Sequence, residues 1–156
     1  MVLILADHLV QRIRVHARRV YPDECCGFLF GSSEGEIKHV TRLHELANAR
    51  GRNRSRRYLI TPETFSQAEQ WAQGMSLEIL GLYHSHPDHP SRPSQFDLDH
   101  SLPWWSYVII SVDRGNPAAL SSWVLKDDRT EFNEESIENA NVKDGTMEVR
   151  SDGMAE

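Results

Sequence analysis

A buried β-strand is predicted over residues 77–83, and it runs directly into His84-Ser85-His86-Pro87. Side chains two residues apart on a strand point to the same face, so His84 and His86 would project into one pocket while Ser85 points away. Pro87 has no backbone N–H to give to a neighbouring strand, and it predicts that the strand ends there in a turn-rich loop. The strand would therefore offer two imidazole nitrogens to one metal ion.

A carboxylate follows this strand closely in the sequence. Residues 94–97 (Ser-Gln-Phe-Asp) are typical of a helix start, which would hold Asp97 in the first turn of a short helix, and Ser94 with Asp97 also fits a simple helix cap. Two neutral imidazoles and one carboxylate leave the fourth position of a tetrahedral zinc ion open to water, which separates a catalytic site from a closed structural one. Because zinc lowers the pKa of such a water to about 7, His84, His86 and Asp97 predict a zinc hydrolase with one Zn2+ per chain.

An amide hydrolase of this kind also needs a carboxylate outside the ligand set, because the attacking water must lose a proton and the leaving amine must gain one. Glu24 is the candidate, since it stands at the mouth of a second apolar strand predicted over residues 26–31. Asp23 and Glu36 fit this role equally well by spacing alone. Ser94 would donate a hydrogen bond to the oxyanion, an interaction typically worth about 2.7–4 kcal/mol.

At these positions the sequence resembles the JAMM, or MPN-plus, metalloprotease domain. It has Glu24 ahead of a cysteine–glycine pair, then His84-x-His86, seven residues, Ser94, two residues and Asp97. The resemblance covers most of the chain before the acidic C-terminal segment and is most specific between His84 and Asp97. It implies that the two histidines and Asp97 bind zinc, that Glu24 is the general base and that Ser94 assists the oxyanion. Non-catalytic members of the family lack parts of this set, so the complete set favours an active enzyme.

Compact prokaryotic-type members of this family act on ubiquitin-like sulfur-carrier proteins, and this short chain resembles them. The resemblance implies a metallopeptidase or isopeptidase that hydrolyses an amide bond at the C-terminus of such a carrier, whose tail would enter as an added β-strand. A non-catalytic MPN-type scaffold, which binds a protein without turnover, is one alternative. A RadC-like domain with a DNA-linked role is another, but that pattern has Asn between the histidines and Gly soon after the proline, where this chain has Ser85 and Asp88-His89.

The switch between helical and strand periodicity predicts an α+β fold, in which a mixed β-sheet is flanked by helices. The family resemblance implies the JAMM/MPN-like arrangement, which is cytidine-deaminase-like. Trp104 and Trp105 are expected to pack at the start of a strand, with Trp104 close enough to the site loop to line a substrate groove. Helices are expected at residues 7–20, 62–74 and 94–101, and strands at residues 2–5, 26–31, 36–46, 77–86, 107–112 and 120–125.

Several other chemistries find no support in the sequence. The His-Glu-x-x-His pattern of thermolysin-like zinc enzymes and the Gly-rich loop of P-loop NTPases are both absent. Cys25 and Cys26 would point to opposite faces of a strand, and they form neither a C-x-x-C pair nor a disulfide framework. Reduced cysteines fit a cytoplasmic protein. The apolar residues 1–5 are too short to span a membrane, and Asp7 follows them in place of a cleavage site, so neither membrane insertion nor export is expected.

Charge is unevenly distributed along the chain. Residues 127–156 contain ten acidic and three basic residues and so carry −7, whereas the first 126 residues carry +1, which together give the net charge of −6. We therefore expect a metallopeptidase domain over residues 1–132 and a mostly disordered acidic tail over residues 133–156. A last strand at residues 147–149, or a tail that folds back over the arginine-rich residues 50–57, is the alternative.

Residues 50–57 contain five arginines. They predict either a solvated loop or a patch for an acidic protein, a terminal carboxylate or nucleic acid. Nucleic acid is disfavoured because the patch has no aromatic residue and the whole chain is acidic.

Overall fold

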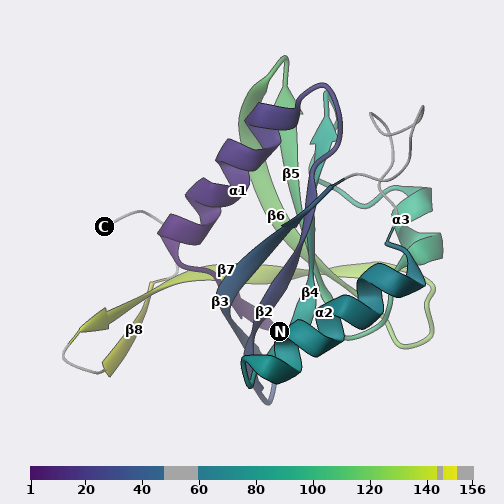
Figure 1. The fold of residues 1–156 in the computed structure, drawn as a ribbon. Helices are drawn as coiled ribbons and strands as arrows, with labels where there is room; N and C mark the ends of the chain where they lie inside the picture. Colours follow the sequence, from purple (N-terminus) through teal and green to yellow (C-terminus); the bar gives the residue numbers. More distant parts are fainter. Residues whose placement is uncertain (48–59, 144–145, 151–156) are drawn as a thin grey trace.

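The computed structural model describes residues 1–47, 60–143 and 146–150. Every helix and strand expected before residue 126 is present, and most ends agree within a few residues (Figure 1). The predicted α+β class, with a mixed sheet flanked by helices, is confirmed. The elements are β1 (Val2–Ile4), α1 (Asp7–Val20), β2 (Cys26–Glu34), β3 (Ile37–Leu46), α2 (Pro62–Gly74), β4 (Glu78–Pro87), α3 (Gln95–His100), β5 (Ser106–Asp113), β6 (Asn116–Leu125), β7 (Phe132–Lys143) and β8 (Thr146–Arg150).

The strands form a sheet that closes on itself. Its order is β1-β3-β2-β4-β5-β6-β7-β8, and β1 also pairs with β7, so β1 links two strands that are far apart in the sheet order. The β4–β5 pair is parallel, as are both pairs made by β1, and the other pairs are antiparallel. β4 lies between β2 and β5 in the middle of the sheet, which explains why its sequence is a nearly continuous apolar run.

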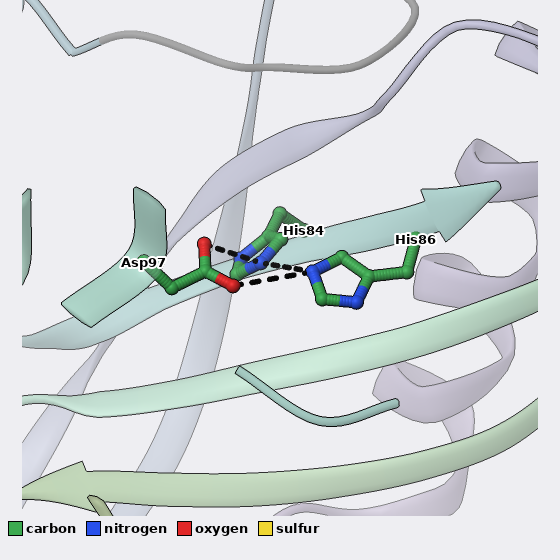
Figure 2. Close-up of side chains that lie close together, drawn as sticks. All are labelled: His84, His86 and Asp97. Carbon is green, nitrogen blue, oxygen red and sulfur yellow. Dashed lines mark hydrogen bonds and ion pairs between the residues drawn. The ribbon is translucent and has the colours of Figure 1, made fainter. Parts of the chain in front are cut away.

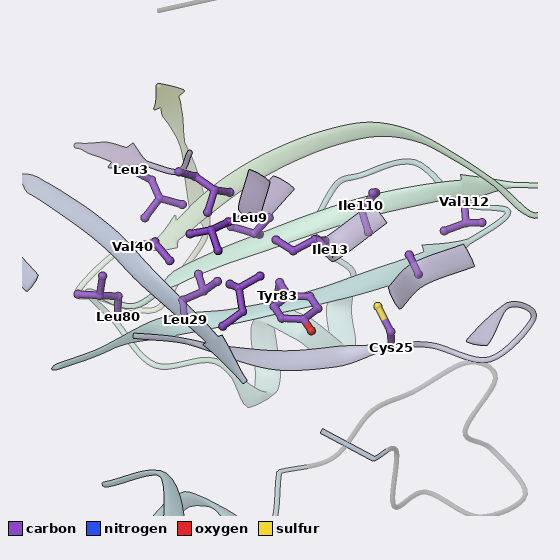
Figure 3. Close-up of a cluster of buried hydrophobic side chains, with 14 residues drawn as sticks. Leu3, Leu9, Ile13, Cys25, Leu29, Val40, Leu80, Tyr83, Ile110 and Val112 are labelled. Atoms are coloured by element: carbon purple, nitrogen blue, oxygen red, sulfur yellow. The ribbon is translucent and has the colours of Figure 1, made fainter. Parts of the chain in front are cut away.

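Helix α1 covers one face of the sheet with its apolar stripe. Leu9, Ile13 and Ala17 recur at helical spacing and are buried in a cluster that includes Tyr83 of β4 (Figure 3). Each fully buried Leu or Ile side chain contributes about 1.5–3 kcal/mol by leaving water. His16 faces the same core, and its Nδ1 lies 2.7 Å from the Tyr83 hydroxyl, so both buried polar groups are hydrogen-bonded.

Helix α2 packs against the other face of the sheet. Ala72 lies in a second buried cluster with Leu82 of β4 and Tyr107 of β5. His84 and His86 share the strand phase of Leu82, so they point to the face that carries α2. β4 is therefore buried on both sides, with its apolar residues in two cores and its histidines at the carboxyl end of one of them.

The acidic segment is where the structure differs from the expectation. The expectation of disorder is wrong for residues 133–143, because they belong to β7, which pairs with both β6 and β1. Glu135 and Asn139 are buried there. β8 contains the alternative strand at residues 147–149 and pairs with β7. The sheet therefore extends across the boundary expected at residue 132.

Two expectations remain, one about the arginine-rich residues and one about membrane insertion. The arginine-rich residues 50–57 lie outside the described residues, as do residues 151–156. Within the described ranges, no helix combines the length and apolar character that crossing a membrane requires.

Candidate metal centre

The three predicted metal ligands converge at the end of β4. His84 and His86 project from β4, and Asp97 faces them from the first turn of α3 (Figure 2). The Nε2 atoms of the two histidines lie 3.2 Å apart. Asp97 places Oδ1 3.3 Å from His84 Nε2 and Oδ2 3.2 Å from His86 Nε2. In the described part of the chain, these three side chains are the group whose ligand atoms lie close enough to share one metal ion.

The spacing of these atoms fits a tetrahedral ion. Zinc binds histidine nitrogen at about 2.0–2.1 Å and carboxylate oxygen at about 2.0–2.2 Å, so two donors of a tetrahedron lie about 3.3 Å apart. The observed separations of 3.2, 3.3 and 3.2 Å agree with that value. Imidazole nitrogen and carboxylate oxygen are also donors that zinc accepts. The residues present therefore fit zinc, and three protein ligands leave its fourth position for water.

The protonation states of the ligands suit a metal. His86 Nδ1 lies 2.9 Å from the carbonyl oxygen of Pro90, which only accepts, so Nδ1 carries the proton and Nε2 presents its lone pair to the site. Burial lowers the pKa of His84, and the nearby Asp97 carboxylate only partly opposes this, so His84 is neutral at pH 7. Burial acts to raise the pKa of Asp97, but its contacts with His84 and His86 and the hydrogen bond from the Ser94 N–H together lower it below its ordinary value.

Ser94 fixes Asp97 as the N-cap of α3. The Asp97 N–H donates to Ser94 Oγ at 3.1 Å, and the Ser94 N–H donates to Asp97 Oδ2 at 2.8 Å, which together make a capping box. The Ser101 hydroxyl donates to the Asp97 carbonyl oxygen at 2.5 Å. The capping prediction for Ser94 and Asp97 is confirmed. Because Ser94 Oγ accepts in this bond, its own proton is available for donation to a ligand.

Glu24 lies where β2 begins, beside the end of β4. The two strands are antiparallel with Cys26 opposite His84, and the backbone bond from the N–H of residue 85 to the carbonyl of residue 25 extends the ladder by one pair. If the strand alternation continues one residue before β2, Glu24 would lie opposite His86 on the histidine face. The side chain of Glu24 is only 7% exposed.

Of the two alternative carboxylates, Glu36 is remote from the histidines. Glu36 lies in the turn between β2 and β3, at the end of β2 that is remote from the histidines. Asp23 lies in the turn after α1, where its N–H donates to the Val20 carbonyl oxygen at 2.8 Å. The structure thus separates Glu36 from the histidines, whereas Asp23 and Glu24 both lie at the histidine end of β2.

The adjacent cysteines are placed unfavourably for a thiol mechanism. Cys25 and Cys26 are free and buried. Burial raises the pKa of each thiol to about 12, so neither is a thiolate at neutral pH. This excludes the two cysteines as ordinary nucleophiles and agrees with the rejection of a thiol protease from the sequence.

An apolar groove adjoins the three ligands. It has a volume of about 260 Å³ and is lined by side chains from α2, α3, β4 and the start of β5. Phe65 and Trp105 stack there with ring centroids 5.6 Å apart. Leu82, two residues before His84, and Phe96, the residue before Asp97, also belong to the lining, so the groove lies on the elements that carry the metal ligands.

Trp105, rather than Trp104, lines this groove. The sequence favoured core packing for both tryptophans, with a substrate groove as the alternative for Trp104; Trp105 packs against Phe28, whereas Trp104 is exposed and lies outside the groove. Trp104 instead lines a separate hollow. The two residues are adjacent and identical in type, so the direction of each side chain depends on the phase with which β5 begins, which the local sequence does not encode.

Comparison with known proteins identifies the family. A profile described as prokaryotic homologs of the JAB domain matches residues 6–126. The chain belongs to the prokaryotic JAB family. The resemblance to JAMM/MPN-type domains predicted from the sequence is confirmed.

Several relatives of this prokaryotic JAB protein carry names. It is 32% identical over 108 residues to the desampylase of Haloferax volcanii, covering 69% of this chain and 76% of that protein. It is 30% identical over 113 residues to a "Probable TtuB-protein conjugate cleaving protease" of Thermus thermophilus, covering 72% of each. It is 29% identical over 99 residues to tail tip assembly protein K of Escherichia phage N15. That match covers 61% of this chain but only 36% of the phage protein.

Solved structures share the fold of this prokaryotic JAB chain. A protein from Salinibacter ruber is 42% identical with a TM-score of 0.67, covering 88% of this chain and 90% of that one. A JAB1/MPN domain protein from Archaeoglobus fulgidus is 19% identical with a TM-score of 0.53, covering 88% and 98%, and it shows the fold alone. The predicted JAMM/MPN-like arrangement is thereby confirmed.

Proposed function

We propose that this chain is a zinc-dependent metallopeptidase that hydrolyses an amide or isopeptide bond at the C-terminus of a ubiquitin-like sulfur-carrier protein in the cytoplasm. The observation that carries the proposal is the convergence of His84, His86 and Asp97 with the donor spacing of a tetrahedral ion. A zinc ion held by these side chains would polarise the scissile carbonyl and lower the pKa of a water molecule.

The residues around the ligands have distinct roles in the proposed reaction. Glu24 would accept a proton from the attacking water and pass it to the leaving amine, a contribution of typically about 10²–10⁴-fold for a positioned carboxylate. Its position just before β2, whose Cys26 pairs with His84, and its low exposure support this assignment. Ser94, exposed at the edge of the site, would donate its hydroxyl proton to the oxyanion while still accepting the Asp97 N–H.

The groove supports a polypeptide tail as the substrate. Its volume of about 260 Å³ and its stacked Phe65 and Trp105 rings suit an extended segment that places an apolar side chain beside the scissile bond. Two of the similar proteins described above are named desampylase and conjugate cleaving protease, which supports a carrier conjugate as the substrate class.

Zinc content and cleavage are measured on the same preparations to test this proposal. After mild chelation and reloading, elemental mass spectrometry should find about one zinc per wild-type chain and per Glu24→Gln chain, and far less in His84→Ala and Asp97→Ala. Cleavage of an isopeptide conjugate between a sulfur-carrier protein and a lysine peptide should fall by at least about 100-fold in Glu24→Gln. Glu69→Gln, an exposed α2 position, is the matched control and should retain both properties.

Two results would contradict the proposal at different points. A folded wild-type chain that takes up no zinc would remove the metallopeptidase assignment. A zinc-loaded chain that binds the carrier but cleaves no conjugate would instead favour the non-catalytic scaffold. Full activity of Glu24→Gln would leave the enzyme assignment in place and remove Glu24 from the mechanism.

A further inference from the structure

A second concave surface lies away from the metal centre. It has a volume of about 760 Å³ and is bordered by the N-terminal residue, the β2–β3 turn, Trp104, the end of β6 and the start of β7. We call it the acidic hollow. Because it includes Glu36, which lies at the end of β2 remote from the strand end that faces His84, the hollow and the metal centre occupy different ends of the sheet. In Figure 1 the N-terminus lies at the lower end of the sheet, whereas α3 is higher and to the right.

The hollow carries a strong negative charge. Its ionisable groups are the carboxylates of Glu36, Asp127, Asp128, Glu134 and Glu135, the ammonium of Lys126 and the α-amino group of Met1, so negative charges outnumber positive ones. The lysine ammonium lies 3.2 Å from the carboxylate of Glu131, which offsets its charge. Four of the five carboxylates are exposed, so their field extends into the space in front of the hollow. A concave surface lined by one sign of charge concentrates ligands of the opposite sign.

Glu135 provides a buried acceptor in this hollow. It is 4% exposed, and its Oε1 accepts from the Ser122 hydroxyl at 2.7 Å. Its Oε2 is buried too, and no donor among the described residues reaches that atom. Lys38 attracts Glu135 electrostatically but donates its hydrogen bonds to the Trp104 carbonyl oxygen and to Ser106 Oγ. A cationic donor that enters the hollow would satisfy an oxygen that is otherwise costly to bury.

Trp104 provides a fixed apolar surface beside these carboxylates. Its side chain is 37% exposed, and its φ of 75° is a left-handed conformation that non-glycine residues rarely adopt. The buried Lys38 contacts Trp104 in two ways. Its ammonium lies 4.3 Å from the centroid of the indole ring and donates a hydrogen bond to the Trp104 carbonyl oxygen. Val124 and Leu125 extend the apolar lining. Backbone strain retained at an exposed aromatic residue is a feature of ligand-contacting positions.

The arrangement of the carboxylates selects the kind of ligand. Within the described residues, the three-residue cluster able to share one metal ion is the His84, His86 and Asp97 group, so the carboxylates of the hollow do not converge on a single point charge. They suit a cation with several separated charges. A volume of about 760 Å³ also accommodates several side chains, and the indole ring offers contact to an apolar one.

We propose that the acidic hollow docks a basic segment of a partner protein, with a lysine or arginine side chain at Glu135 and an apolar side chain on Trp104. Charge complementarity determines the basic part of the partner, and the exposed indole ring of Trp104 determines the apolar part. The proposal is independent of the proposed hydrolase function, because the hollow shares no residue with the metal centre or the groove beside it.

Fluorescence anisotropy with a labelled peptide that alternates arginine and leucine tests the proposal. The wild-type chain should bind it saturably at low salt, and more weakly as salt is added. Trp104→Ala and the double variant Asp127→Asn/Glu134→Gln should each weaken binding by at least about 10-fold, which corresponds to about 1.4 kcal/mol. The double variant Glu69→Gln/Asp113→Asn changes charge equally at exposed positions elsewhere and should bind like wild type. Zinc content should be the same in all of these proteins.

Four results would overturn the proposal. They are the absence of saturable binding, equal affinity in wild type and the hollow variants, displacement of the peptide by spermidine at equal concentration, and salt-sensitive self-association of the wild type that the hollow variants abolish. The third would assign the hollow to small polycations, and the fourth would assign it to a second copy of this chain. Because the hollow variants replace exposed residues, a far-UV circular dichroism spectrum like that of wild type should accompany each measurement.

Discussion

Replacing Lys38 with methionine should change how the stability of this protein depends on pH. Lys38 is 0% exposed, and burial lowers its pKa from the ordinary value of 10.5 to about 8, although attraction to Glu135 partly opposes this. An unfolded chain restores the ordinary value, so between pH 8 and 10.5 the unfolded state binds more protons than the folded state. The free energy of unfolding contributed by this group must therefore rise with pH across that window.

The size of the effect follows from the two pKa values. The difference between 10.5 and about 8 corresponds to roughly 3 kcal/mol, at about 1.36 kcal/mol for each pKa unit. About 2 kcal/mol of this should appear between pH 7 and pH 10, because the unfolded-state group is still partly protonated at the upper limit. Lys38→Met carries no titrating group and fills a similar volume, so it should lack this contribution. Its free energy of unfolding relative to that of wild type should therefore be highest near pH 7.

Urea denaturation followed by circular dichroism at several pH values, in EDTA so that metal binding adds nothing, measures this difference. The gap between wild type and Lys38→Met should change by about 2 kcal/mol in favour of wild type as pH rises from 7 to 10. Lys126→Met is the control, because it removes a partly exposed lysine and keeps Lys38, so its free energy of unfolding should still rise with pH. Parallel curves for wild type and Lys38→Met would refute the reasoning.

Three further substitutions have expected effects on stability. Ser94→Ala should lower the free energy of unfolding by about 1 kcal/mol, because the cap that accepts the Asp97 N–H is lost, and Ser94→Thr should recover most of it in the same urea titration. Gly81→Ala should cost at least about 3 kcal/mol or prevent folding, since an added Cβ would lie 1.8 Å from the Ser106 carbonyl oxygen; a wild-type melting temperature would contradict this. Gly74→Ala, at the end of α2 with open space around it, should stabilise the protein by up to about 1 kcal/mol, and a lower melting temperature would show that the helix end needs glycine.

Local patterns in the sequence determined most of the secondary structure. The bounds of α1 and α2 agree with the prediction because apolar spacing and helix starts depend on neighbouring residues only. The shared face of His84 and His86 follows from strand alternation, and the capping box at Ser94 follows from a spacing of three residues. The family could be predicted as well, because its motif is a set of spacings along the chain.

Contacts between distant parts of the chain were decided only by the tertiary structure. β7 is polar in composition, and it is a strand because β1 and β6 supply its backbone partners, which no local pattern encodes. The register of β2 against β4 pairs Cys26 with His84, so the start of β2 lies at the histidines and the turn that carries Glu36 lies at the remote end. The phase of β5 sends Trp105 to the groove and Trp104 to the acidic hollow. In each case the deciding quantity is a register between strands, and a register depends on which segments meet after the chain has folded.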